Sequence, residues 1–265
     1  MSAADGPGTP PDRKPATTGD RTEPEYGEAW VYESIVKALP GIDVSERAAV
    51  ALQFLGFEAA LLVLASVYGL PEAVPGGTVA IGVATGGSLL MQEMSRRIRA
   101  ADVPEDYAQV LFGSSIEVVL GLLAFLGVVT YVFVVDPRGL EVAGVPLRTA
   151  DRPLLETLLG ERPPAAATYL GLLVLWDVSY RIGTGWWAAV VAAWRSRRFD
   201  FDAATAADLR RVDRLNLGFG LLQLALLPFL WEHPLLFVAV AGHVAAVLLV
   251  GGYALVQLRP ENVSP

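Results

Sequence analysis

Six long apolar blocks hold 138 of the 265 residues, and they constrain the fold more than any other feature of this sequence. They cover residues 48–70, 74–91, 110–135, 165–194, 215–231 and 235–258. As helices, the 17-residue block reaches about 26 Å and the 24-residue block about 36 Å, which brackets a hydrocarbon core of roughly 30 Å. None shows the period-2 alternation of a membrane barrel strand. The sequence therefore predicts an all-α polytopic bundle of six transmembrane helices.

Composition supports a membrane protein over a soluble enzyme. Hydrophobic residues make up 53% of the chain and charged residues 18%, against roughly 25% charged in a soluble domain. The alternative is that the blocks are buried helices of a soluble protein. In a soluble protein, amphipathic helices would have to cover these six apolar helices. The sequence outside the blocks contains few amphipathic segments.

The placement of Lys and Arg predicts the topology. Fifteen of these residues lie before the first block, between the second and third, between the fourth and fifth, and after the sixth. Only four lie on the opposite side, all in the loop 136–164. Because basic residues concentrate on the cytoplasmic side of membrane proteins, we expect a cell-membrane protein with both termini in the cytoplasm.

The pattern along the chain predicts three parts. Residues 1–28 are rich in Pro, Gly, Asp and Thr and are expected to form a disordered tail without a signal-peptide core. Residues 29–41 contain an amphipathic stretch that predicts a short interfacial helix. Residues 42–260 are the expected membrane domain. Outside the bilayer, we expect a short helix between Asp151 and Gly160, and a polar helix from Asp200 or Asp202 through Arg214.

The candidate functional site consists of polar residues near the centres of the predicted spans. These are Glu58, Glu117, Asp177, Arg181, Gln223 and His243. A charge at such a position costs roughly 2.5–3.5 kcal/mol on insertion scales, so these side chains normally face protein or water. Three carboxylates and one Arg sum to −2 with neutral His243. That charge requires protonated carboxyl groups, a bound cation or a protonated His243.

Asp177 and Arg181 are one helical turn apart and are expected to pair. The pair has two open interpretations: it locks the helix against its neighbours, or Asp177 exchanges Arg181 for a proton or cation. The segment 183–185, with the sequence Gly-Thr-Gly, follows directly. It is expected to break or kink the helix, as in the discontinuous helices of transporters.

Glu58 and Glu117 have no partner on their own helices. Small residues surround Glu117 at positions 113, 114, 121 and 124, which predicts a closely packed neighbouring helix. The Gly-rich block 74–91 is the expected neighbour. Here too two interpretations are open: the carboxyl groups form an ion-coupled site, or they are neutral acids that hold helices together.

Several functional classes lack their motifs. The absence of Cys excludes thiolate metal sites and thiol catalysis, and the two His residues form no metal-ligand pattern. No phosphate-binding loop or nucleophile elbow is found, and the basic loops need no nucleic acid to explain them. We therefore expect no enzyme, cofactor or metal site. The hypotheses are a small permease for a proton, cation or small solute, and a non-catalytic membrane scaffold or partner subunit.

Four segments carry a family resemblance: 26–34 (YGEAWVYES), 111–120 (LFGSSIEVVL), 173–189 (LVLWDVSYRIGTGWWAA) and 216–224 (NLGFGLLQL). Together with a pI near 4.8 and only two Lys, they make the chain resemble uncharacterised six-span membrane proteins of halophilic archaea. The resemblance implies a helical membrane protein and no particular activity.

Overall fold

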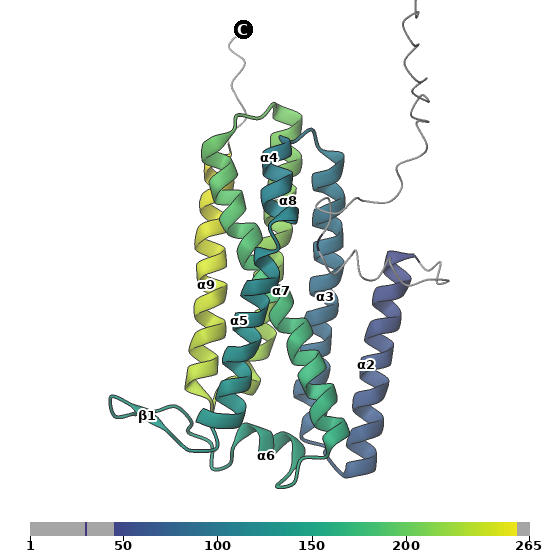
Figure 1. Cartoon of the computed structure of the whole chain (residues 1–265), viewed down its shortest axis with the longest axis vertical. Coiled ribbons are helices and arrows are strands. Elements are labelled where there is room, and N and C mark those ends of the chain that lie inside the picture. The colour runs from purple at the N-terminus through teal and green to yellow at the C-terminus, as the bar shows by residue number, and fades with distance from the viewer. Residues whose placement is uncertain (1–29, 31–44, 259–265) are drawn as a thin grey trace, which may run out of the picture.

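The structure, a computed structural model, describes residue 30 and residues 45–258, and this part of the chain is almost entirely helical (Figure 1). Long helices lie side by side, and a small hairpin with one short helix lies at one end of the bundle (Figure 1). The helical segments are α2 (Glu46–Tyr68), α3 (Ala73–Ala100), α4 (Glu105–Ala108), η1 (Gln109–Gly113), α5 (Ile116–Thr130), η2 (Tyr131–Val135), α6 (Leu154–Leu159), α7 (Ala165–Arg198), α8 (Ala203–Leu222), η3 (Gln223–Leu230) and α9 (Pro234–Gln257). The hairpin pairs β1 (Glu141–Val142) with β2 (Val145–Pro146).

Four helical segments in the described part of the chain are long and apolar enough to cross a membrane: Arg47–Tyr68, Ala73–Ala100, Glu105–Val135 and Pro234–Gln257. They coincide closely with four of the six apolar blocks. The block 165–194 lies in α7, where Asp177 and Arg181 lower the mean hydropathy. The block 215–231 is divided between α8 and the 3-10 helix η3, which contains Pro228. The helical class is thus confirmed, and four segments suggest a membrane protein.

The third block is broken near its start. The chain passes from α4 into η1, a π-helix, and α5 begins only after Ser115. Ser115 has φ +53°, a left-handed conformation that is uncommon for a residue with a side chain. The predicted break at 183–185 is wrong, because α7 runs without interruption from Ala165 to Arg198.

Glycines set the contact between α5 and α7. A Cβ on Gly183 would lie 2.9 Å from the Cα of Gly121, and a Cβ on Gly121 would lie 2.8 Å from the Cα of Tyr180. The two backbones therefore touch, as small residues allow in membrane helix pairs. The prediction that the block 74–91 packs against the small residues around Glu117 is wrong, since α7 packs there instead.

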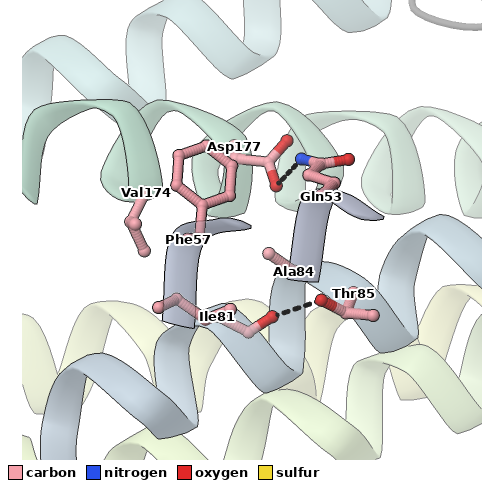
Figure 2. Close-up of a pocket in the computed structure, with 7 residues that line it drawn as sticks. All are labelled: Gln53, Phe57, Ile81, Ala84, Thr85, Val174 and Asp177. Carbon is pink, nitrogen blue, oxygen red and sulfur yellow. Dashed lines mark hydrogen bonds between the residues drawn. The ribbon is translucent and has the colours of Figure 1, made fainter. Parts of the chain in front are cut away.

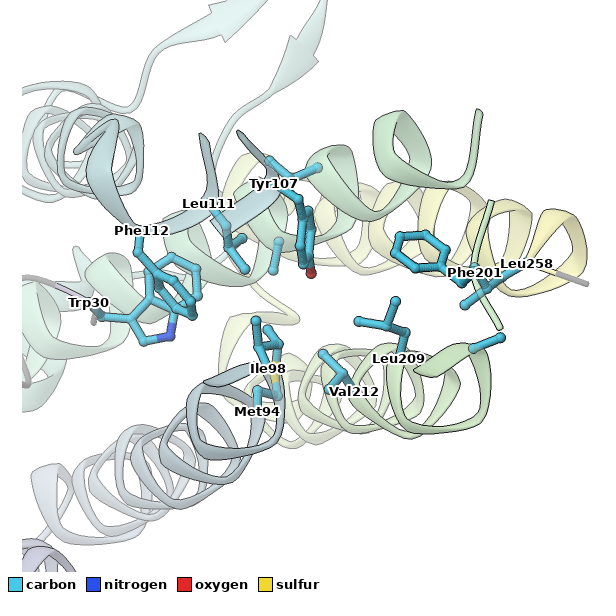
Figure 3. Packing of buried hydrophobic residues seen from close by; sticks show 13 residues of the cluster. Trp30, Met94, Ile98, Tyr107, Leu111, Phe112, Phe201, Leu209, Val212 and Leu258 are labelled. Carbon is cyan, nitrogen blue, oxygen red and sulfur yellow. The ribbon is translucent and has the colours of Figure 1, made fainter. Parts of the chain in front are cut away.

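The largest apolar core lies at the end of the bundle away from the hairpin (Figure 3). Its larger members include Met94, Ile98, Tyr107, Leu111, Phe112, Phe201 and Leu209. Trp30 joins this core, with its ring centroid 4.8 Å from that of Phe112. The rest of the expected tail and interfacial helix lies outside the described residues.

The N-termini of α8 and α6 lie where local sequence signals predict them. Asp202 caps α8 and accepts hydrogen bonds from the backbone N–H groups of Ala204 and Thr205 at 2.8 and 3.0 Å. This confirms the polar helix expected before the fifth block. The short helix expected between Asp151 and Gly160 is α6, and its first N–H, that of Leu154, donates to Asp136 at 2.5 Å.

Candidate functional site

Asp177 and Arg181 form the predicted ion pair within α7. The Arg181 Nη1 atom lies 2.7 Å from Asp177 Oδ1, and the Arg181 side chain is only 1% exposed. Their spacing of four residues places both side chains on one face of the helix. The two formal charges therefore balance each other inside the bundle.

Arg181 also binds α3. Its Nε donates to the carbonyl oxygen of Ala84 at 2.6 Å and to Ser88 Oγ at 3.0 Å, and its Nη2 also donates to Ser88. Gly87 makes room for this side chain, because a Cβ there would lie 2.7 Å from the Arg181 Cδ. Since the guanidinium bonds α3 as well as Asp177, the arrangement favours a role in holding α7 to α3.

The second oxygen of Asp177 faces α2. The Gln53 amide donates to Asp177 Oδ2 at 3.0 Å, at the edge of a shallow pocket between α2, α3 and α7 (Figure 2). The pocket is lined by Gln53, Phe57, Ile81, Ala84, Thr85, Val174 and Asp177. Gln53 was not among the predicted residues, although a polar amide inside an apolar block is a visible signal.

Glu58 lies between α2 and α3. The Thr78 hydroxyl donates to Glu58 Oε1 at 2.7 Å. The other oxygen, Oε2, is buried and has no hydrogen-bond partner among the residues that the structure describes. This contact favours a helix-fastening role for Glu58.

Glu117 has the most unusual surroundings of the six predicted residues. Its side chain is 0% exposed, and neither carboxyl oxygen has a hydrogen-bond partner within the described part of the chain. It lies in the first turn of α5, directly after the break at Ser115 and one turn before Gly121. Positions four residues apart share a helix face, so Glu117 faces α7. A buried carboxyl group without partners is stable only when it binds a proton or a cation.

Gln223 and His243 are also incompletely bonded. Gln223 is 1% exposed, lies where α8 passes into η3, and has no described partner for either amide atom. The His243 Nε2 atom is buried without a described partner, and the ring lies 6.4 Å from that of Trp186. The six predicted residues thus do not form one described hydrogen-bonded cluster: Asp177 joins Arg181, Glu58 joins Thr78, and the carboxyl oxygens of Glu117 and amide atoms of Gln223 have no described partner.

One buried polar network was not predicted and lies at the hairpin end of the bundle. We call Tyr131, Asp136, Arg148 and His233 the hairpin-end network. The His233 Nδ1 atom lies 3.1 Å from the Tyr131 hydroxyl and 3.3 Å from Asp136 Oδ1. Arg148 Nε lies 3.6 Å from the same Asp136 oxygen. The network connects η2, the loop that follows it and the start of α9.

A second unpredicted network lies at the opposite end. We call Tyr107, Arg195 and Asp213 the arginine-end network. Arg195 is 0% exposed, and it donates to the Tyr107 hydroxyl at 2.9 Å and to Asp213 Oδ2 at 2.6 Å. Asp213 is buried as well, so the two opposite charges are in direct contact inside the bundle. Tyr107 lies 88 residues and Asp213 18 residues from Arg195 in the sequence, so no local pattern indicates that they are partners.

Comparison with known proteins assigns the chain to a family. No curated protein and no solved structure matches the chain. A family model does match, over residues 25–254, and this range includes all six predicted site residues and both unpredicted networks. The chain belongs to DUF7530, a family of unknown function.

Proposed function

We propose that this chain is a six-span protein of the cell membrane, with both termini in the cytoplasm, that moves protons or small cations across the bilayer. Its membrane domain covers residues 42–260, with α7 and the α8–η3 segment as the fourth and fifth spans. Glu117 is the residue that binds the transported ion.

The distribution of arginines supports this orientation. Three clusters lie at the end of α3, at the end of α7 and near the middle of α8, and the ends of α3 and α7 are opposite the hairpin (Figure 1). The clusters are Arg96, Arg97 and Arg99; Arg195, Arg197 and Arg198; and Arg210, Arg211 and Arg214. Clustered basic residues are typical of the cytoplasmic side. The acid-rich, Lys-poor composition fits a high-salt cytoplasm such as that of halophilic archaea.

The observation that carries the proposal is that neither carboxyl oxygen of Glu117 has a hydrogen-bond partner among the described residues. A group used only to fasten helices gains stability from hydrogen bonds, and in the described chain Glu117 makes none. The helix break at Ser115 places the carboxyl group in the first turn of α5, where the helix dipole favours a negative charge. The group can therefore bind a proton or a cation, and the dipole lowers the cost of the charged carboxylate when the ion leaves, as ion exchange requires.

The second candidate function is a membrane scaffold or partner subunit. The bonds of Arg181 to α3 and the hydrogen bond between Thr78 and Glu58 favour it, because both connect helices. We assign these residues to holding the bundle together. Glu117 makes no such bond to another helix within the described part of the chain.

Purified protein in liposomes tests the proposal. A pH-sensitive dye inside the vesicles reports proton flux when a pH gradient or a potassium diffusion potential is imposed, and sodium and potassium gradients test cation flux. Glu117→Gln removes the ionisable group while keeping its size. Glu72→Gln is the matched control, because Glu72 is exposed at the start of α3 and makes no capping hydrogen bond.

We expect flux from the unaltered protein and from Glu72→Gln, and a loss of flux in Glu117→Gln. Equal flux from the unaltered protein and Glu117→Gln would overturn the proposal, as would the absence of any gradient-driven flux. An intact helical spectrum of Glu117→Gln in detergent shows that lost flux is not lost folding.

A further inference from the structure

The broken segment Glu105–Val135 carries one tyrosine near each end, and each hydroxyl group joins a buried ion pair. Tyr107 belongs to the arginine-end network and Tyr131 to the hairpin-end network. Glu117 lies between them, ten residues after Tyr107 and fourteen before Tyr131. Both tyrosines are buried. Glu117 therefore lies between the arginine-end network and the hairpin-end network along its own segment, and both networks are buried ion pairs.

The arginine-end network connects α4, α7 and α8 at the end of the bundle opposite the hairpin. Tyr107 comes from α4, Arg195 from the end of α7 and Asp213 from α8. All three side chains are buried, and Arg195 Nε has no hydrogen-bond partner among the described residues. If water enters, the Nε group of Arg195 can donate a hydrogen bond to it. Hydration therefore favours separation of Arg195 from Tyr107 and Asp213.

The hairpin-end network connects three elements at the other end. Tyr131 belongs to η2, Asp136 and Arg148 to the loop that carries the hairpin, and His233 to the turn before α9. The Tyr131 hydroxyl also donates to the carbonyl oxygen of Leu147 at 3.0 Å. Asp136 Oδ2 accepts the first N–H of α6. Opening this network would break the side-chain contacts of the loop with His233 and the contact of Asp136 with α6, while Thr149 still bonds the carbonyl oxygen of Glu232.

We propose that the two networks are the inner and outer gates of one path to Glu117, and that they open alternately. Ion pairs that join separate elements in a dry interior have two discrete arrangements, bonded or hydrated, which is what a gate needs. The structure has both networks closed, and Glu117 is inaccessible from either end. This inference rests on the proposed function, since a gate has a purpose only if Glu117 exchanges an ion.

The chain has no native Cys, so a single thiol introduced by Glu117→Cys can report access from each side. The test combines this thiol with Tyr107→Phe or Tyr131→Phe, two identical chemical changes at opposite ends of one segment. Each removes only a hydroxyl group and preserves the ring. A membrane-impermeant methanethiosulfonate is added to one face of oriented proteoliposomes, and the labelling rate is measured.

We expect Tyr107→Phe to raise the labelling rate from the cytoplasmic face only, and Tyr131→Phe to raise it from the outer face only. The rise should be about tenfold, the change expected when a closed state loses a hydrogen bond to a charged group. Asp213→Asn provides a second, stronger change at the inner gate and should act from the same face as Tyr107→Phe.

Unchanged labelling in both tyrosine variants, or a rise from the same face in both, would overturn the gates. Flux assays with native Glu117 separate this failure from that of the proposed function. Flux that depends on Glu117, without sided labelling, rejects the gates alone. Sided labelling without flux in any gradient rejects the transport proposal and leaves two conformational closures.

Discussion

Gly183 in α7 packs directly on Gly121 in α5, so that a Cβ on Gly183 would lie 2.9 Å from the Cα of Gly121. Nothing but hydrogen fits between the two backbones at this point. The contact fixes the rotation of α5 and therefore the direction in which Glu117 points. The two glycines support the candidate site without contributing a polar atom to it.

Gly183→Ala should destabilise the protein by about 1–3 kcal/mol, because the added methyl group meets backbone that cannot move aside. The midpoint of thermal unfolding in detergent, followed by intrinsic fluorescence, measures the effect. Gly171→Ala is the control on the same helix, since a Cβ there meets no atom of the described residues within 4 Å. It should be neutral or slightly stabilising, because Ala is the better helix former. Equal losses in both variants would contradict the close contact.

Asp213→Ala should cost about 3–5 kcal/mol, because it leaves the Arg195 charge buried without its partner. The exposed pair of Arg211 with Asp208 provides the matched control, and Asp208→Ala should change stability by less than about 1 kcal/mol. Chemical denaturation in detergent gives both values. A double change, Arg195→Met with Asp213→Leu, should recover most of the lost stability. If it does not, the buried pair itself stabilises the fold.

Asp202 should make part of the stability depend on pH. Hydrogen bonds from the Thr205 hydroxyl and from the backbone N–H groups of Thr205 and Ala204 lower the pKa of this carboxyl in the folded state. Its stabilising effect is therefore complete above the unfolded pKa of about 3.9 and is lost as pH falls through the lower folded value.

Asp202→Asn is the comparison, because Asn also caps helices but does not titrate. The unaltered protein should melt at a higher temperature than this variant at pH 7, and the difference should shrink below about pH 4. A difference that stays constant down to pH 2 would show that the charge of Asp202 contributes nothing.

Asp136→Asn should loosen the loop that carries α6. Asp136 accepts the Leu154 N–H and lies beside Arg148 and His233, so an amide here replaces an ion pair with a weaker contact. A glutamyl endopeptidase should then cleave faster after Glu156 or Glu161, which follow in the same loop. Asp151→Asn serves as the control, because Arg148 binds the backbone oxygen of Asp151 and the substitution keeps that atom. Equal cleavage in both variants would argue against the network.

The sequence allowed prediction of features that depend on neighbouring residues. The pair of Asp177 with Arg181 follows from a spacing of one helical turn, and the start of α8 at Asp202 follows from a capping residue. The break near Ser115 also had a local signal, the segment Gly113-Ser114-Ser115. The small residues Gly113 and Ser114 predict a surface for helix packing, whereas the structure has a single left-handed residue, Ser115, directly after them. Gly183 predicts a break, yet α7 continues through it. A glycine that packs against another helix is tolerated without a break.

Contacts between distant residues could not be predicted. Which helix faces Glu117 depends on how far each helix is rotated about its axis, and hydropathy patterns of nearly uniform blocks do not specify that rotation. The partners of Tyr131 and Arg195 come from other elements for the same reason. A single sequence contains the residues of such networks but not their pairing.

The 3-10 conformation of η3 affects how far its chain extends. A 3-10 helix rises about 2.0 Å per residue, against about 1.5 Å for an α-helix. The eight residues of η3 therefore lengthen the 17-residue block 215–231 by about 4 Å, to roughly 30 Å. That length equals the thickness of a typical hydrocarbon core. Pro228 cannot donate a backbone hydrogen bond, and the tighter winding around it gives the shortest apolar block the length that the proposed fifth span needs to cross the lipid without thinning it.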